Sequence, residues 1–171
     1  MNHSIIPILG FAAASGTGKT TLLIQLLPIL KNLGLRVGLI KHSHHNFEID
    51  HVGKDSFELR KAGATPVVLI SKYRRVIIEE SENFIEPHLT EQIALFNPEK
   101  TDLILVEGFR HEAFAKIELH RTELNNPLLY PNDSHIIAIA SNTILETSLP
   151  QFNLNNPAEI ADFILHTFLK L

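Results

Sequence analysis

The chain contains no cysteine and no tryptophan, and only one methionine, among its 171 residues. Without cysteine it can form neither disulfide bonds nor thiolate metal sites, and it has no cysteine nucleophile, which is compatible with a reducing compartment. Basic residues are not in excess either, because the net charge is −4 and the isoelectric point is about 6.2. General nucleic-acid and anionic-membrane binders are normally basic, so the composition disfavours both kinds of partner.

A long hydrophobic run is missing as well. The first apolar stretch, residues 5–14, has no cationic segment before it, as a signal peptide would. It is also too short to be a membrane-spanning helix. We therefore expect a cytoplasmic protein that does not associate with membranes. Hydrophobic residues make up 44% of the chain and charged residues 20%, the balance of a soluble globular protein. The length predicts one domain over residues 1–171, or at most two small ones.

Short apolar runs alternate with helix-like stretches along the chain. The runs are rich in Ile and Val, which predicts strands that are buried on both faces, as in a parallel sheet. They comprise residues 5–14, 37–40, 67–70, 103–106 and 136–140. Helical patterns cover residues 19–34, 55–62, 89–96 and the segment from 157 onward. The order of elements predicts an α/β fold with a mainly parallel sheet flanked by helices.

Three details modify this simple pattern. Residues 76–80 follow a basic turn, and residues 115–121 alternate between apolar and polar side chains. Alternation is typical of a strand with one solvated face, so we expect an antiparallel addition to the sheet. In the first helix, Pro28 interrupts a stretch that is apolar nearly all round. This pattern predicts a buried helix that is kinked at the proline, and one of its sides could also pack against another subunit.

Residues 13–20 read Ala-Ala-Ser-Gly-Thr-Gly-Lys-Thr and match the phosphate-loop pattern G-x-x-x-x-G-K-[ST] except at Ala13. The loop follows a predicted strand and opens a predicted helix, which predicts a P-loop NTPase-type fold. Backbone N–H groups and the helix N-terminus bind phosphate oxygens in such a loop. We expect Lys19 to reach the β- and γ-phosphates and Thr20 to contact Mg²⁺. The candidate phosphate-binding residues are Ser15, Gly16, Thr17, Gly18, Lys19, Thr20 and Thr21.

An acidic residue is expected to help hold the metal. Asp102 and Glu107 flank four apolar residues, so their carboxylates lie about 17 Å apart if that run is a strand. Ligands of open α/β sheets bind at the carboxyl ends of the strands, which selects Glu107 for Mg²⁺ or its water in a Walker-B-like role. Asp102 is then a residue at the start of the strand, and a purely structural acidic turn at Glu107 is the alternative.

Histidines gather after the second predicted strand, at the same expected edge of the sheet. His42, His44 and His45 follow Lys41, and Asp50 comes soon after. The segment could face substrate or phosphate, with Asp50 near Mg²⁺; it could be a solvated loop; or it could bind a transition metal, although its spacing matches no tight ligand pattern. Arg110, which follows Glu107, is a candidate phosphate clamp because its guanidinium presents a fixed fork of donors.

The motifs do not identify the nucleotide base. Many GTPases read guanine with the string N-K-x-D or T-K-x-D, and neither occurs in this chain. Ser141 and Asn142 follow the strand predicted at residues 136–140, so backbone groups there and the Asn142 side chain could reach a base. A preference for guanine therefore does not follow from the phosphate loop.

Four segments together resemble the MobB family, the molybdopterin-guanine dinucleotide biosynthesis adaptor proteins. They are residues 13–23, 38–45, 53–64 and 102–112, which follow the family's order over most of the chain. The resemblance implies a GTP- and Mg²⁺-binding homodimer with at most slow GTPase activity. It also implies partnership with a MobA-type guanylyltransferase, which joins GMP to molybdopterin, and contact with molybdopterin or its molybdenum form. By this resemblance, Gly16, Gly18, Lys19, Thr20 and Thr21 bind phosphate and Glu107 has the Walker-B role. The residues it implies to face the cofactor or the nucleotide are His42, His44, His45, Asp50 and Arg110.

Two other functions use the same phosphate loop. A small-molecule kinase would also bind nucleotide there, but the chain shows no arginine-rich lid segment to close over a transferred phosphate. A metal-insertion GTPase would account for the histidines, but such proteins usually carry cysteine ligands and a guanine-reading string, which are both absent. The adaptor hypothesis is therefore preferred. We expect the residues that support slow GTP hydrolysis to be Lys19, Glu107 and Asp50.

Overall fold

The computed structural model describes residues 6–43, 46–81 and 86–171, and these form two compact units. The first unit consists of Met1–His42 with His88–Leu171, and the second of Ser43–Pro87. Each unit is described by itself below, and a single domain over residues 1–171 stays a prediction. Among the described residues, no helix is long and apolar enough to cross a bilayer.

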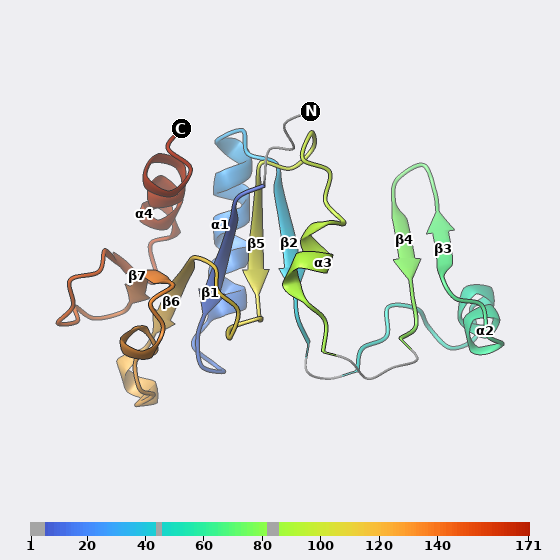
Figure 1. Ribbon diagram of the computed structural model, residues 1–171, viewed down its shortest axis with the longest axis horizontal. Helices are drawn as coiled ribbons and strands as arrows, with labels where there is room; N and C mark the ends of the chain where they lie inside the picture. Colours follow the sequence, from blue (N-terminus) through green and yellow to red (C-terminus); the bar gives the residue numbers. More distant parts are fainter. Residues whose placement is uncertain (1–5, 44–45, 82–85) are drawn as a thin grey trace. The chain divides into compact units, whose positions relative to one another are not determined.

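A six-stranded parallel sheet forms the centre of the first unit (Figure 1). Its strand order is β2-β5-β1-β6-β7-β8, and every neighbouring pair is parallel. Because all strands run the same way, their carboxyl ends lie along one edge. The strands are β1 (Ile8–Ala12), β2 (Val37–Lys41), β5 (Leu103–Glu107), β6 (Lys116–His120), β7 (Ile136–Ser141) and β8 (Gln151–Asn153).

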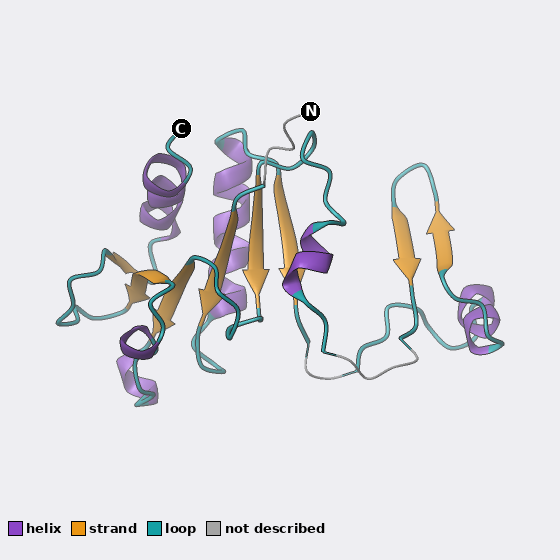
Figure 2. Cartoon of the chain, in the orientation of Figure 1, coloured by secondary structure: helices purple, strands orange, loops and turns teal. Residues whose placement is uncertain are grey.

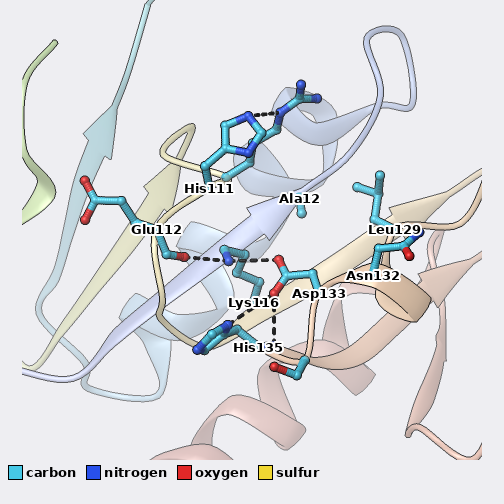
Figure 3. A pocket seen from close by; sticks show the side chains of 10 residues that line it. Ala12, His111, Glu112, Lys116, Leu129, Asn132, Asp133 and His135 are labelled. Carbon is cyan, nitrogen blue, oxygen red and sulfur yellow. Dashed lines mark hydrogen bonds and ion pairs between the residues drawn. The ribbon is translucent and has the colours of Figure 1, made fainter.

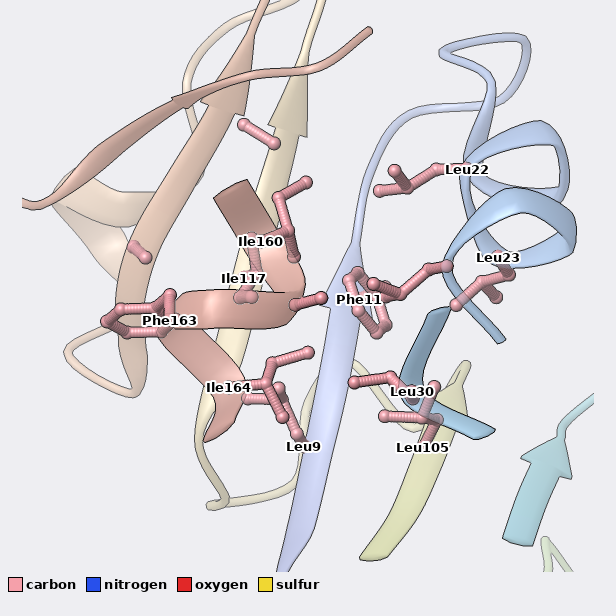
Figure 4. Packing of buried hydrophobic residues seen from close by; sticks show 14 of the residues in the cluster. Leu9, Phe11, Leu22, Leu23, Leu30, Leu105, Ile117, Ile160, Phe163 and Ile164 are labelled. Carbon is pink, nitrogen blue, oxygen red and sulfur yellow. The ribbon is translucent and has the colours of Figure 1, made fainter. Parts of the chain in front are cut away.

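Helices cover the two faces of this sheet. In Figure 2, helix α1 (Lys19–Asn32) lies behind the strands and helix α3 (Leu89–Ile93) in front of them. Helix α4 (Pro157–Asp162) contacts α1 and continues into a π-helical turn, Phe163–Phe168. The larger core joins α1 and α4 to one face of the sheet (Figure 4). Its fully buried side chains include Leu9, Leu26, Leu30, Leu105, Ile117, Ile160 and Ile164.

The smaller core lies on the other face of the sheet. Leu89 of α3 packs there against Ile104 and Val106 of β5, together with Phe109 and Phe114 from the following loop. Side chains alternate between the two faces along a strand, so β5 supplies residues to both cores and is buried from Leu103 to Val106. The prediction of a strand buried on both faces, made from its near-continuous apolar residues, is confirmed for β5.

Strand β6 corrects one expectation. The alternating pattern of residues 115–121 predicted an antiparallel strand with a solvated face, but β6 is parallel to both β1 and β7, and all five of its residues are buried. Its polar side chains bind loop groups instead of water. Lys116 donates hydrogen bonds to Asp133 and to the carbonyl of Glu112, while Glu118 accepts from the backbone N–H groups of Leu129 and Tyr130. The alternation in the sequence thus corresponds to polar side chains that bind a covering loop, not to a solvated face.

The second unit contains helix α2 (Asp55–Lys61) and an antiparallel pair, β3 (Val67–Ile70) with β4 (Arg75–Ile78). The antiparallel addition expected near residues 76–80 is confirmed, but the prediction of a buried parallel strand at residues 67–70 is wrong. Val68 and Ile70 are exposed within their unit. A short apolar run cannot by itself distinguish a buried strand from one arm of a hairpin, because both favour β-branched residues.

Helix α1 confirms the predicted start at Lys19 and includes Pro28 in its interior. The expectation of a buried helix holds for one side of α1 only, since Ile24 is 66% exposed and Pro28 also faces outward. Packing of that side against another subunit stays a prediction. An outward position suits Pro28, because its ring and its missing N–H then disturb no core contact. The exposed side of α1 is mixed, with Ile24 and Pro28 next to polar residues such as Gln25.

Candidate functional site

The phosphate loop joins the carboxyl end of β1 to the first turn of α1. Gly16 and Gly18 have φ angles of 80° and 101°, in the left-handed region that side chains with a Cβ rarely adopt. Gly18 is the N-cap residue, and no side chain caps the helix or places an acidic group in its first turn. The first N–H groups of α1 and the positive end of its dipole are therefore available to an anion.

The side chains of the loop divide into bracing and outward-facing groups. Thr17 is buried, and its hydroxyl donates a 2.8 Å hydrogen bond to the carbonyl of Ala14, which closes the loop on itself. The hydroxyl proton of Thr17 is thus used within the loop and is not available to a ligand. The remaining candidates face outward to a greater extent: Ser15, Thr20 and Thr21 are exposed, and Lys19 is partly exposed.

Glu107 ends β5, directly beside β1, and lies opposite Phe11 on one side and Lys41 on the other. Its Oε2 atom is 3.5 Å from Nζ of Lys41, so the end of β2 places a cation at the same edge. Asp102 lies at the opposite end of β5, where Arg36 donates to it from Nε at 2.8 Å. Hydrogen bonds from the side chain and the backbone N–H of Arg36 lower the pKa of Asp102 to about 2. The two acids thus occupy opposite ends of one strand, as the spacing predicted.

The turn after Glu107 packs against the end of β2. Gly108 has a φ of 105°, and a Cβ on it would lie 2.5 Å from the Cβ of His42. The His42 ring stacks on Phe109 with 4.7 Å between ring centroids, and the His42 N–H donates to the carbonyl of Glu107. His42 is therefore held beside the candidate metal ligand Glu107 by both its ring and its backbone.

A cavity of about 580 Å³ opens beside this turn, on the sheet face opposite α1 (Figure 3). Its volume is in the range of small-molecule sites. Arg110 and His111 line it, and Nε of Arg110 donates to Nε2 of His111 at 3.1 Å. Lys116 lies buried at its base, with Nζ 2.9 Å from Oδ2 of Asp133. Although burial raises the pKa of Asp133, its hydrogen bonds from Lys116 and His135 bring the net pKa below the ordinary value.

A second cavity, of about 200 Å³, lies against the phosphate loop itself. Ala13, Ala14 and Thr17 form one wall, and Arg110 and Leu129 line both cavities. A ligand on the phosphate loop and a molecule in the larger cavity would therefore share a boundary at Arg110. The exposed guanidinium of Arg110 can serve either of them.

Arg121 is a site residue that motif matching missed. Its Nε atom donates a 2.8 Å hydrogen bond to the carbonyl of Thr17, and Nη2 donates to Asn155 at 3.3 Å. A Cβ on Gly18 would lie 3.6 Å from the same Nη2. The signal that could have found Arg121 is its position directly after a strand, which is the criterion that selected Glu107 and Arg110.

The remaining candidates lie in the second unit or outside the described residues. Asp50 lies in the second unit, where its Oδ1 atom accepts from the N–H of His51 and its buried Oδ2 atom has no hydrogen-bond partner in the described residues. His44 and His45 lie outside the described residues. Within the part of the chain that the structure describes, no group of three or more His, Asp or Glu side chains is arranged to hold a metal ion. Roles for these three residues stay predictions.

Comparison with known proteins adds an independent observation. The family described as Molybdopterin guanine dinucleotide synthesis protein B (MobB) matches residues 8–142. The molybdopterin-guanine dinucleotide biosynthesis adapter protein of Escherichia coli (strain K12) is 44% identical over 98% of this chain and 96% of its own length. The protein of the same name from Haemophilus influenzae is 43% identical over 98% and 94%. A crystal structure of Bacillus subtilis MobB has a TM-score of 0.73 and 25% identity, covering 93% of this chain and 96% of that one.

Proposed function

Because this chain belongs to the MobB family, we propose that it is a GTP-binding adaptor that assists the attachment of GMP to molybdopterin. The relatives covered almost end to end are named as adapter proteins of molybdopterin-guanine dinucleotide biosynthesis. The absence of cysteine supports a cytoplasmic place of action. A kinase or metal-insertion function has no comparable support.

The observation that carries nucleotide binding is the geometry of the phosphate loop. Two left-handed glycines, Gly16 and Gly18, precede a 14-residue helix whose first turn has no capping side chain. Backbone N–H groups there would bind phosphate oxygens, and Lys19 would place a cation beside them. The hydrogen bond from Thr17 to Ala14 holds the loop in this shape.

The oxygen atoms at this edge suit Mg²⁺, which prefers hydroxyl, carboxylate and phosphate ligands. We propose that the Thr20 hydroxyl and the Glu107 carboxylate hold the ion together with the nucleotide. The ion would neutralise phosphate charge, and Lys41 beside Glu107 would add to the positive potential. Asp50 is a further proposed ligand, on the sequence pattern alone.

The larger cavity supports a second ligand. We propose that molybdopterin, or its molybdenum form, binds on this edge with Arg110 and His42 facing it, together with His44 and His45 from the sequence. The cavity volume of about 580 Å³ suits a small heterocycle, and the exposed guanidinium of Arg110 in its lining suits a phosphate group. A MobA-type guanylyltransferase is the proposed enzyme partner that uses both ligands.

We also propose that the chain forms a homodimer, because each unit exposes apolar side chains. Strand β2 is an edge strand, and its Leu39 is exposed; Ile24 of α1 is exposed in the same unit. In the second unit, Val68, Ile70 and Ile77 are exposed on the β3–β4 hairpin. Edge strands and apolar patches of this kind favour pairing with another chain.

Calorimetric titration with GTP and ATP in the presence of Mg²⁺ tests the nucleotide proposal. We expect GTP to bind more tightly than ATP, and Lys19→Ala to weaken GTP binding at least tenfold, about 1.4 kcal/mol, through loss of a phosphate contact. Lys31→Ala, at an exposed position in the last turn of the same helix, is the matched control and should bind as the unmodified protein does. Tighter binding of ATP, or unchanged affinity in Lys19→Ala, would contradict the proposal.

The adaptor role has a separate test. Guanylyltransfer to molybdopterin by a MobA-type enzyme would be reconstituted with and without this chain. We expect a higher rate or yield with it, and a smaller gain with Lys19→Ala. No change in rate or yield would count against the adaptor function while leaving nucleotide binding intact.

A further inference from the structure

The loops that follow β6 and β7 bring two polar side chains together at the carboxyl edge of the sheet. Nδ2 of Asn142 donates a 2.6 Å hydrogen bond to Oε1 of Glu123, and Oδ1 of Asn142 accepts a 3.2 Å hydrogen bond from the N–H of Thr122. A single amide thus ties the ends of two adjacent strands together. It also fixes where the Glu123 carboxylate lies.

This pair is connected to the phosphate loop. Strand β6 is next to β1 and parallel to it, so the turn after β6 lies at the same sheet edge as the loop after β1. Arg121 opens that turn and donates a hydrogen bond to the carbonyl of Thr17. Glu123 is only two residues further on, at most about 7 Å along the backbone. A nucleotide with its phosphates on the loop can therefore extend its base along the edge toward Glu123.

The chemical character of the Glu123 surroundings suits a base. The Glu123 carboxylate is exposed and ionised: hydrogen bonds from its own backbone N–H and from Asn142 lower its pKa. An ionised carboxylate only accepts hydrogen bonds, and it can accept several at once. Leu124 directly follows Glu123 and is 41% exposed, and Ile144 is two residues after Asn142 and is 96% exposed. Exposed apolar side chains this near in the chain are available to contact a planar ring.

We propose that Glu123, oriented by Asn142, reads the guanine base of the bound nucleotide. The N1–H and 2-amino groups of guanine would donate two parallel hydrogen bonds to the carboxylate. Adenine presents an acceptor at N1 and lacks the 2-amino group. The carboxylate would therefore face an acceptor and form neither hydrogen bond, which disfavours adenine. The assignment rests on the proposed function, because it requires a nucleotide on the phosphate loop. It supplies the guanine selectivity for which the sequence holds no N-K-x-D or T-K-x-D string.

Nucleotide analogues test this proposal in the full-length chain. ITP lacks the 2-amino group, and XTP carries a carbonyl oxygen in its place. The unmodified protein should bind GTP about tenfold more tightly than ITP, through one charge-assisted hydrogen bond. Glu123→Gln replaces one acceptor with a donor, so we expect GTP affinity to fall at least tenfold and XTP to become the preferred nucleotide. Asn142→Ala should lower the GTP-to-ITP ratio by a smaller factor.

Glu146→Gln makes the same chemical change at another exposed position in the loop after β7, and it should leave all three affinities unchanged. Far-ultraviolet circular dichroism of each variant would establish that it is folded. GTP binding with an unchanged GTP-to-ITP ratio in Glu123→Gln would overturn the base-reading assignment and leave the proposed function standing. Failure of the unmodified protein to bind any nucleotide would overturn both.

Discussion

The Nε atom of Arg121 donates a 2.8 Å hydrogen bond to the carbonyl oxygen of Thr17, a residue 104 positions earlier in the chain. The bond ties the end of β6 to the phosphate loop at the end of β1. Because Thr17 is also braced by its own hydroxyl, the loop is held from both sides. Arg121 therefore acts as a positioning residue, one that shapes the loop without being part of the phosphate-loop motif.

Replacing Arg121 should weaken nucleotide binding without changing base selectivity. We expect Arg121→Met to lower the affinities for GTP and ITP by the same factor, roughly threefold to tenfold, because about 1 kcal/mol of loop-positioning hydrogen bond is lost. Arg74→Met, at an exposed position of the second unit, is the control. Calorimetric titration with both nucleotides measures the two affinities. An unequal loss would show that Arg121 contacts the base.

The close approach of Gly108 to His42 predicts a steric penalty. In Gly108→Ala the new Cβ would meet the His42 Cβ at 2.5 Å in addition to the strain of a φ of 105°. Gly34→Ala is a matched control, because Gly34 has a φ of 87° but no atom within 4 Å of an added Cβ. We expect about 1–2 kcal/mol of destabilisation at Gly34 from strain alone and a clearly larger value at Gly108. Urea denaturation of the two variants makes the comparison, and equal losses would contradict it.

The buried Lys116–Asp133 pair predicts a stability defect that a second substitution relieves. Lys116→Met keeps the length and packing of the side chain but leaves Asp133 partly buried without its cation. We expect a loss of about 2–3 kcal/mol in the free energy of unfolding. Asp133→Asn in the same chain should recover part of it, since the uncompensated charge is then gone. Lys100→Met, at an exposed position, should be nearly neutral.

The Arg36–Asp102 pair predicts a specific dependence on pH. The pKa of Asp102 is depressed to about 2 in the folded chain, whereas an unfolded aspartate titrates near 3.9. The pair therefore stabilises the fold above about pH 4, and this contribution disappears as the pH falls toward 2. We expect Asp102→Asn to be destabilising at pH 7 and to approach the unmodified protein near pH 2. Because the pair is largely exposed, salt should reduce the effect. The same difference in stability at both pH values would contradict this account.

Local patterns were sufficient to predict much of this site. The phosphate loop, the start of α1 at Lys19 and the placement of Glu107 at the ligand edge with Asp102 at the opposite end all follow from strand and helix periodicity. Each depends on residues close together in the chain. The partners of polar strand residues were not predictable in the same way, as Lys116 and Glu118 demonstrate, because those partners lie on loops that only the folded chain brings over β6.

The amino-acid sequence by itself determined the fold class, the phosphate loop and the resemblance to the MobB family, because these are carried by residue types at short, regular spacings. Only the tertiary structure decided that β6 lies within the parallel sheet, that residues 67–70 form one arm of a hairpin, that Arg121 contacts the phosphate loop, and that Asn142 contacts Glu123. The physical reason is that strand order is set by which apolar faces can be buried together. Strand order, in turn, determines which loops meet at the carboxyl edge of the sheet, where we propose that the nucleotide binds.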